Sequence, residues 1–251
     1  MSALLIRIFI PASNESKSCL HDLDDCREGL IPRSLLRYKF DAPSACCGVF
    51  DSWLAEIVAG FHRICPGITI QILERSSSEL NALMENRQLD FGFVSKREGR
   101  HRWYPLINDE LVAVLPEAHP YASALAAPAD IFSREPYIQI HPDVETDNVL
   151  YFKSIGILPQ VCFSTNDIYA ACAMVRAGLG IALVNRLFIT EHMEGIAAVS
   201  LLPKPCIEFG IILPEKDYIA PAAKRFEEYA FAHLDTLNLK NDCPAVFLSD
   251  A

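Results

Sequence analysis

Apolar residues along this chain fall into two patterns, short β-branched runs and longer segments with helical spacing. In the first half, the short runs predict strands at Tyr38–Ala42, Ile68–Leu73, Phe91–Val94 and Glu110–Leu115. The segment after the first strand has an apolar stripe at helical spacing and predicts a helix that ends at the Pro66-Gly67 turn; its stripe is Phe50, Trp53, Leu54, Ile57, Val58 and Phe61. This alternation of strands and helices predicts a mostly parallel sheet with helices on its faces.

A second set of alternating elements follows residue 120. It predicts strands at Tyr137–Ile140, Gln160–Phe163 and Ile207–Leu213, with helices at Asp147–Ile155 and from Pro221 onwards. In the first set, Ser76 and Glu79 have the spacing of a capping box, which predicts the start of a helix running to about Gln88. The pattern therefore favours two α/β units in one chain.

The stretch from residue 164 to residue 186, STNDIYAACAMVRAGLGIALVNR, is the most informative part of the sequence. A polar cluster, Ser164–Asp167, begins a helix of small and apolar residues, and Gly178 ends it. Ile181–Val184 then predicts a buried strand that ends in the polar residues Asn185 and Arg186. A helix–glycine–strand unit with polar residues at both ends is suited to holding a ligand.

This stretch resembles the second-domain signature of LysR-type transcriptional regulators, and Ile68–Ser95 resembles the signature of their first effector-binding subdomain. The resemblance covers about residues 37–236. It implies an α/β fold of two Rossmann-like lobes, the type 2 periplasmic-binding-protein fold, joined by two crossing strands near residues 112–116 and 207–213. The implied domains are an N-terminal extension with a linker-helix remnant (1–36), lobe I (37–116, completed by 208–240), lobe II (117–207) and a C-terminal tail (241–251).

The N-terminal extension departs from that family. Cys19, Leu23, Cys26 and Leu30 follow heptad spacing, although a solvated amphipathic helix has the same pattern. The resemblance makes His21–Leu30 the end of the family's linker helix. Nothing in residues 1–17 can form a three-helix DNA-reading domain, so binding to DNA is expected only through a helix-turn-helix domain absent from this chain.

Charge and cysteine content narrow the function further. The 22 basic residues against 32 acidic ones give a net charge of −10, which disfavours a surface that neutralises DNA phosphates. Nine cysteines without a C-x-x-C pair indicate reduced thiols and a cytoplasmic location. No apolar run approaches the roughly 18 residues that a membrane span needs. We therefore expect no membrane partner.

Several chemical motifs are set aside. Gly178-Leu179-Gly180 follows a helix and precedes a strand, which is the wrong order for a dinucleotide-binding turn. The seven histidines show no metal-ligand spacing, and Asp22–Asp25 lacks the glycine and the distal glutamate of a calcium loop. Cys46-Cys47 leaves redox sensing open as an alternative to a purely structural role. We expect no catalytic residue, no metal and no cofactor.

The expected site lies between the two lobes, where loops follow the carboxyl ends of the strands. Hydroxyl and backbone N–H groups there, with Lys96 or Arg97 nearby, suit a carboxylate. Helix capping is the alternative role for each serine, and it is compatible with ligand contact. The candidate effector-binding residues are Ser44, Ala45, Ser76, Ser77, Val94, Ser95, Gln139, His141, Thr165, Asn166 and Asn185.

The sequence thus favours the effector-sensing and dimerising part of a LysR-type regulator, which binds a small metabolite, an organic anion in our hypothesis. A solute-binding protein on the same fold is the alternative, and an enzyme on this fold is a third possibility. We expect a homodimer or a higher oligomer. The stripe Trp53, Ile57 and Phe61 of the first helix is a candidate interface, unless all three face their own core.

Overall fold

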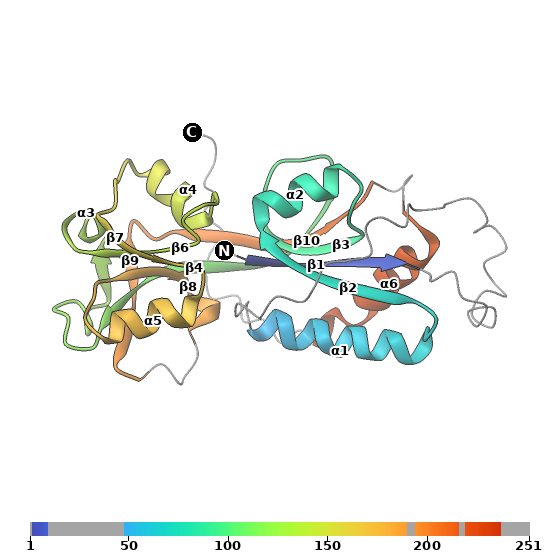
Figure 1. Cartoon of the computed structure of the whole chain (residues 1–251), viewed down its shortest axis with the longest axis horizontal. Helices are drawn as coiled ribbons and strands as arrows, with labels where there is room; N and C mark the ends of the chain where they lie inside the picture. The colour runs from blue at the N-terminus through green and yellow to red at the C-terminus, as the bar shows by residue number, and fades with distance from the viewer. Residues whose placement is uncertain (1, 10–47, 190–193, 216–218, 237–251) are drawn as a thin grey trace.

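The computed structural model of the protein describes residues 2–9, 48–189, 194–215 and 219–236, and these form two lobes arranged along the longest axis (Figure 1). Lobe I contains β1 (Ser2–Phe9), α1 (Gly48–Ile64), β2 (Thr69–Ser76), α2 (Ser77–Glu85), β3 (Phe91–Ser95) and α6 (Pro221–Ala232). Lobe II contains β5 (Ala126–Pro128), α3 (Ile131–Arg134), β6 (Tyr137–Ile140), α4 (Asp147–Ser154), β7 (Val161–Thr165), α5 (Ile168–Arg176), β8 (Ala182–Asn185) and β9 (Ile196–Leu202). Short 3-10 turns, η3 (Arg186–Phe188) and η5 (Leu234–Thr236), follow β8 and α6.

Two strands join the lobes, as the sequence predicted. The long strand β4 (Arg102–Pro116) pairs with β10 (Cys206–Leu213) from Arg102 to Glu110, and then with β8 and β9 from Leu111 onwards. It therefore passes from one lobe to the other within a single strand. The chain returns from β9 into β10, which pairs with both β3 and β4 in lobe I. Helices cover both faces of the sheet that results (Figure 1).

The expectation of a mostly parallel sheet is wrong. Strand β1 lies between β2 and β3 and runs antiparallel to both. The ladders of β10 with β3 and β4, and of β4 with β8 and β9, are antiparallel as well. Among the described strands, only β5–β9 and β6–β7 form parallel ladders. Hydrophobic periodicity identifies a strand but carries no information about its direction. The expected strand Tyr38–Ala42 lies outside the described residues.

The apolar stripe of α1 faces its own core. Trp53, Ile57 and Phe61 are all buried within the chain, and the Phe61 ring makes an edge contact with Phe226 of α6 at 5.2 Å between ring centroids. The Trp53 indole Nε1 also donates to the carbonyl of His233, 3.2 Å away. The idea that this stripe forms an interface between chains is therefore wrong, because lobe I itself covers these side chains.

The 164–186 stretch folds as its sequence predicted. Asp167 caps α5 by accepting a hydrogen bond of 2.7 Å from the Ala170 N–H, and Gly178 adopts a φ of 75° after the helix. Gly180 then packs directly against the backbone carbonyl of Pro136, where a Cβ atom has no room. This close approach brings the start of β8 beside β6. An isolated parallel bridge between Tyr137 and Ile181 joins the two segments there.

Membrane-spanning character and the state of the cysteines can be compared with what the composition predicted. No helix in the described ranges has the length and apolar character needed to cross a membrane. Cys65, Cys162 and Cys172 are free thiols, whereas Cys206 is disulfide-bonded, so the expectation of reduced cysteines throughout is wrong at that position.

Candidate functional site

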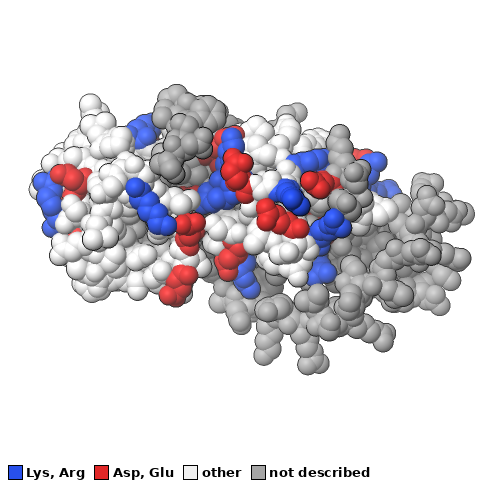
Figure 2. Space-filling model, turned by 90° about the horizontal axis from the view of Figure 1, so that it is seen from above, with Lys and Arg blue, Asp and Glu red and all other residues white. Residues whose placement is uncertain are grey.

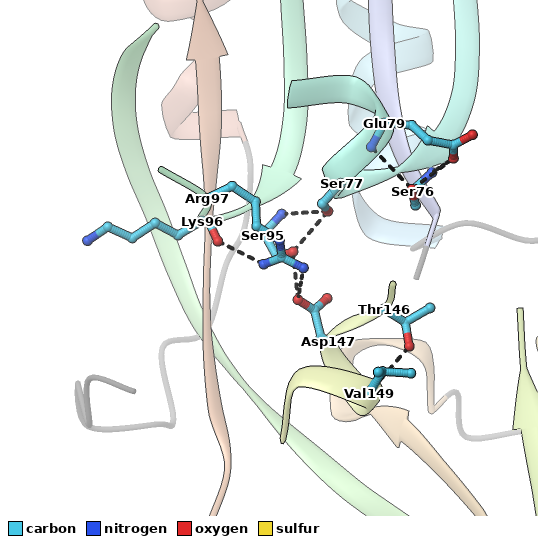
Figure 3. A network of polar contacts seen from close by, with 9 residues as sticks. All are labelled: Ser76, Ser77, Glu79, Ser95, Lys96, Arg97, Thr146, Asp147 and Val149. Carbon is cyan, nitrogen blue, oxygen red and sulfur yellow. Dashed lines mark hydrogen bonds and ion pairs between the residues drawn. The ribbon is translucent and has the colours of Figure 1, made fainter. Parts of the chain in front are cut away.

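A buried polar network joins the two lobes (Figure 3). Asp147, the first residue of α4, reaches from lobe II towards the end of β3 in lobe I. Its Oδ1 accepts hydrogen bonds from the Ser95 hydroxyl at 2.8 Å and from Arg97 Nη2 at 2.7 Å. The Ser95 backbone N–H donates to Ser77 Oγ at 3.1 Å, and the two serine hydroxyls lie 2.9 Å apart. Ser95 and Arg97 of lobe I therefore meet at one carboxylate oxygen of lobe II, and Ser77 of α2 joins the network through Ser95.

The hydrogens of this network have one consistent arrangement. The ionised Asp147 carboxylate can only accept, so the single hydroxyl hydrogen of Ser95 is donated to Asp147 Oδ1. The hydrogen between the two serines then comes from Ser77. Ser77 thus donates to Ser95, and Ser95 donates to Asp147. Such a chain strengthens each member in a buried setting, because each bond polarises the next.

Two helix N-termini meet the network. Ser76 caps α2 through a capping box with Glu79, as predicted, and Ser77 is the first residue of that helix. Thr146 caps α4 by accepting from the Val149 N–H at 3.3 Å, and Asp147 follows it. The positive ends of helix dipoles favour an anion, and Arg97 adds a full positive charge. The arrangement favours one negative charge, which Asp147 supplies.

The network is closed to solvent in this structure. The exposed fractions of Ser77, Ser95 and Asp147 are 2%, 0% and 2%. Within it, Asp147 Oδ2 and Arg97 Nε are buried and have no hydrogen-bond partner. A buried polar atom without a partner costs free energy that an additional group could recover.

A second polar cluster lies where β4 passes between the lobes. Glu110 pairs with Arg186 at 3.0 Å and with Lys204 at 3.5 Å. The neighbouring Asp109 is buried and accepts a hydrogen bond of 3.3 Å from the Leu187 N–H. Burial raises the pKa of Asp109 to about 6, and the hydrogen bond from Leu187 offsets part of that effect. This cluster fastens the crossing point of β4 to the segment after β8.

A third polar group lies at the carboxyl ends of β6 and β7. Gln139 and Ser164 are opposite each other in this parallel ladder, and the His141 N–H donates to the Thr165 carbonyl at 2.9 Å. His141 adopts a positive φ of 54°, which marks a sharp turn directly after β6. Thr165 Oγ1 accepts from the Asp167 N–H at 3.1 Å and so fixes the entry into α5.

The predicted site residues thus fall into separate groups. Ser76, Ser77 and Ser95 lie together at the network, and Gln139, His141, Thr165 and Asn166 lie together at the ends of β6 and β7. Asn185 ends β8 opposite Leu111 and is buried. Val94 packs in an apolar cluster with Leu80, Met84, Leu89 and Ile212. Ser44 and Ala45 lie outside the described residues.

Sequence reasoning named Arg97 as a nearby cation but missed Asp147 and Asp109. A signal for Asp147 was present, because it follows a threonine at the start of a predicted helix, where acidic residues are favoured. Asp109 lies within a single long strand and has no such signal. No group of three or more His, Cys, Asp or Glu side chains within the described ranges is arranged to hold a metal ion.

The sequence matches a known family over most of its length. The model of the LysR substrate binding domain matches residues 40–235. The chain belongs to this family. The Escherichia coli (strain K12) transcriptional activator protein LysR is 30% identical over 154 residues, which are 59% of this chain and 49% of that protein. The chain spans about half to three fifths of the length of the curated relatives it matches.

Solved structures share the fold. The regulatory domain of CcmR from Synechocystis PCC6803, in complex with 2-PG, aligns with a TM-score of 0.60 at 15% identity, covering 73% of this chain and 92% of that one. The effector binding domain of QuiR, in complex with shikimate, aligns with a TM-score of 0.56 at 20% identity, covering 73% and 90%. The predicted fold class, two lobes of the type 2 periplasmic-binding-protein kind, is confirmed.

Proposed function

We propose that this chain is the effector-sensing and dimerising part of a LysR-type transcriptional regulator, and that it binds a small organic anion between its lobes. The observation that carries the proposal is the network around Asp147, where two donors of lobe I, Ser95 and Arg97, bind a carboxylate of lobe II beside the N-termini of α2 and α4. Membership of the LysR substrate-binding family supports a binding role rather than catalysis. The complexes of QuiR with shikimate and of CcmR with 2-PG show that this fold accommodates small molecules.

Burial of the network supports a mechanism that couples binding to movement. Because Ser77, Ser95 and Asp147 are almost completely enclosed, a ligand enters only after the lobes separate. The crossing strand β4 is the natural hinge, since it continues from one lobe to the other. A ligand that binds one lobe arrangement better than the other shifts the balance between them, and this shift is the signal.

The partners of the chain follow from the same proposal. We expect the described residues to make no DNA contact of their own, so that DNA would be bound through a separate helix-turn-helix domain, and we expect the protein to act in the cytoplasm. Figure 2 supports the first point, because Lys and Arg side chains alternate with Asp and Glu on the face shown rather than gathering into one basic surface. Self-association would use the outer face of α1, where Ala55 is exposed.

Isothermal titration calorimetry against a panel of small carboxylates and their neutral amides tests the proposed function. We expect saturable binding of at least one carboxylate and much weaker binding of its amide, because the site is built for a charge. Ser77→Ala should weaken that binding, whereas Ser133→Ala, at an exposed serine of α3, should leave it unchanged. Binding that Ser77→Ala does not alter would remove this network as the effector site.

A further inference from the structure

The donors of the anion site are already in use by a carboxylate of the chain itself. We propose that Asp147 is a built-in competitor of the effector: it holds the site in the absence of ligand, keeps the lobes together, and must leave when an anion binds. The competitor role rests on the proposed function. The occupation of the site by Asp147 does not, because it follows from the contacts alone.

The geometry supports this role. The Ser95 hydroxyl and Arg97 Nη2 both donate to a single oxygen, Oδ1, at 2.8 and 2.7 Å. A free carboxylate placed between the lobes would use these same donors, since a serine hydroxyl and a guanidinium are the groups that bind carboxylates in proteins. The site therefore has the geometry of a ligand complex in which Asp147 takes the place of the ligand.

Charge balance makes simultaneous occupation unfavourable. Arg97 neutralises one carboxylate, and the nearest other cation along the chain, Lys96, pairs with Glu208 at 2.9 Å. A second carboxylate beside Asp147 would be buried next to a like charge, and the one cation that the described residues place against Asp147, Arg97, is already paired. Two like charges in a dry site repel strongly, so an anionic ligand and the Asp147 carboxylate exclude each other.

The Asp147 carboxylate also has fewer hydrogen bonds than it can accept. Its Oδ2 is buried without a partner, while Oδ1 carries both hydrogen bonds. Buried carboxylates normally use several acceptor positions, so this one loses less on leaving the site than a fully bonded group would. A carboxylate ligand with further polar atoms could use the Ser95 and Arg97 donors and the unpartnered Arg97 Nε as well.

Chemical rescue tests the proposal directly, with acetate as the probe because it has the same carboxylate as an aspartate side chain. Asp147→Ala removes the internal anion and leaves its donors empty. We expect sodium acetate to raise the melting temperature of this variant in a saturable way, relative to sodium chloride at equal ionic strength, and to have no such effect on the unaltered protein. Asp130→Ala, at an exposed carboxylate that pairs with Arg134, is the matched control and should show no rescue.

Asp147→Asn provides a second test if the alanine variant does not fold. Asparagine keeps the size and one acceptor oxygen but removes the charge. Acetate should then bind at least ten-fold more tightly than to the unaltered protein, measured by chemical-shift titration of backbone amides near Ser95 and Asp147. Absence of an acetate response in the folded variants overturns the inference.

The outcomes also separate this inference from the proposed function. A carboxylate from the calorimetric panel that binds the unaltered protein and both Asp147 variants with equal affinity overturns the competitor role and leaves effector sensing intact. A tighter complex with both variants supports both. Failure of every carboxylate, acetate included, to bind any of the three proteins overturns both.

Discussion

Arg97, two residues after β3 in lobe I, and Asp147, at the start of α4 in lobe II, form an ion pair with an N–O distance of 2.7 Å. Only 17% of the Arg97 side chain and 2% of the Asp147 side chain are exposed, so the pair is largely removed from water. It joins two segments that are 50 residues apart in the sequence and belong to different lobes. The state of this pair and the relative position of the lobes are therefore linked.

Removing one partner of this pair should destabilise the protein strongly. Arg97→Gln leaves a buried carboxylate without its counter-charge, and we expect the free energy of unfolding to fall by about 3 kcal/mol. The double variant Arg97→Gln/Asp147→Asn should recover part of that loss, because no uncompensated charge remains. Urea denaturation of the single and double variants measures the coupling. Strictly additive losses would show that the two side chains act independently.

The hydrogen bonds between Ser77 and Ser95 should contribute to stability as well as to binding. Ser77→Ala removes the acceptor of the buried Ser95 N–H, so we expect a loss of about 1–3 kcal/mol in the free energy of unfolding. Ser76→Ala removes the cap of α2 and should cost about 1 kcal/mol. If effector affinity falls with Ser77→Ala but not with Ser76→Ala, then Ser77 supports the effector site, directly or through Ser95, and Ser76 serves only as a helix cap. In lobe II, Thr165→Ala tests in the same way whether effector affinity depends on the Thr165 hydroxyl.

The stability of the protein should depend on the protonation of Asp109. Burial raises the pKa of its carboxyl from 3.8 to about 6 in the folded chain, so the folded state holds this proton more tightly than the unfolded state does. The resulting stabilisation is complete below about pH 4 and is lost as the pH rises through 6. At pH 7 and above the charged form costs about 2–3 kcal/mol, at 1.36 kcal/mol for each pKa unit.

Other carboxyl groups titrate in the same pH range, so the contribution of Asp109 is measured as the difference in stability between the unaltered protein and Asp109→Asn. The amide keeps an oxygen that can accept from the Leu187 N–H and carries no charge. We expect the variant to be more stable than the unaltered protein at pH 7.5, by about 2 kcal/mol, and the difference to shrink towards pH 4. Urea denaturation at several pH values measures it. A difference that does not change with pH would contradict a raised pKa at Asp109.

Gly180 should be irreplaceable for a packing reason. A Cβ atom there would collide with the backbone carbonyl of Pro136, which cannot move without shifting β6. We expect Gly180→Ala to cost about 3 kcal/mol, as forced overpacking does. Gly156 is the matched control, because it has a positive φ of 67° but open space around it. Gly156→Ala should cost only about 1–2 kcal/mol from backbone strain, measured by thermal unfolding.

Self-association can be tested on the outer face of α1. Ala55 is exposed there while Trp53 and Ile57 are buried, so Ala55→Glu places a charge on the surface without entering the core. In a symmetric dimer each contact occurs twice, so one substitution introduces two defects. Light scattering should report a dimer for the unaltered chain and more monomer for the variant. Ala232→Glu, at an exposed alanine of α6, is the control, and a strictly monomeric parent would contradict the pairing.

Local patterns determined much of this protein. The stripe on α1, the capping box Ser76–Glu79, the glycine-ended helix before β8 and the proline at the start of α6 were all readable, because each depends on residues within one or two turns of one another. The two family signatures lie in such local units. The fold class and the family could therefore be predicted from the sequence.

Only the tertiary structure decided how these units meet. The place of β1 between β2 and β3, and its direction, depend on pairing partners 60 or more residues away, about which its own apolar run carries no information. The same holds for the site. Ser77, Ser95 and Asp147 are separated in sequence by 18 and 52 residues, and nothing in each local segment states that their side chains share one hydrogen-bond network. Local sequence sets which groups are available, and packing of the two lobes sets which of them meet.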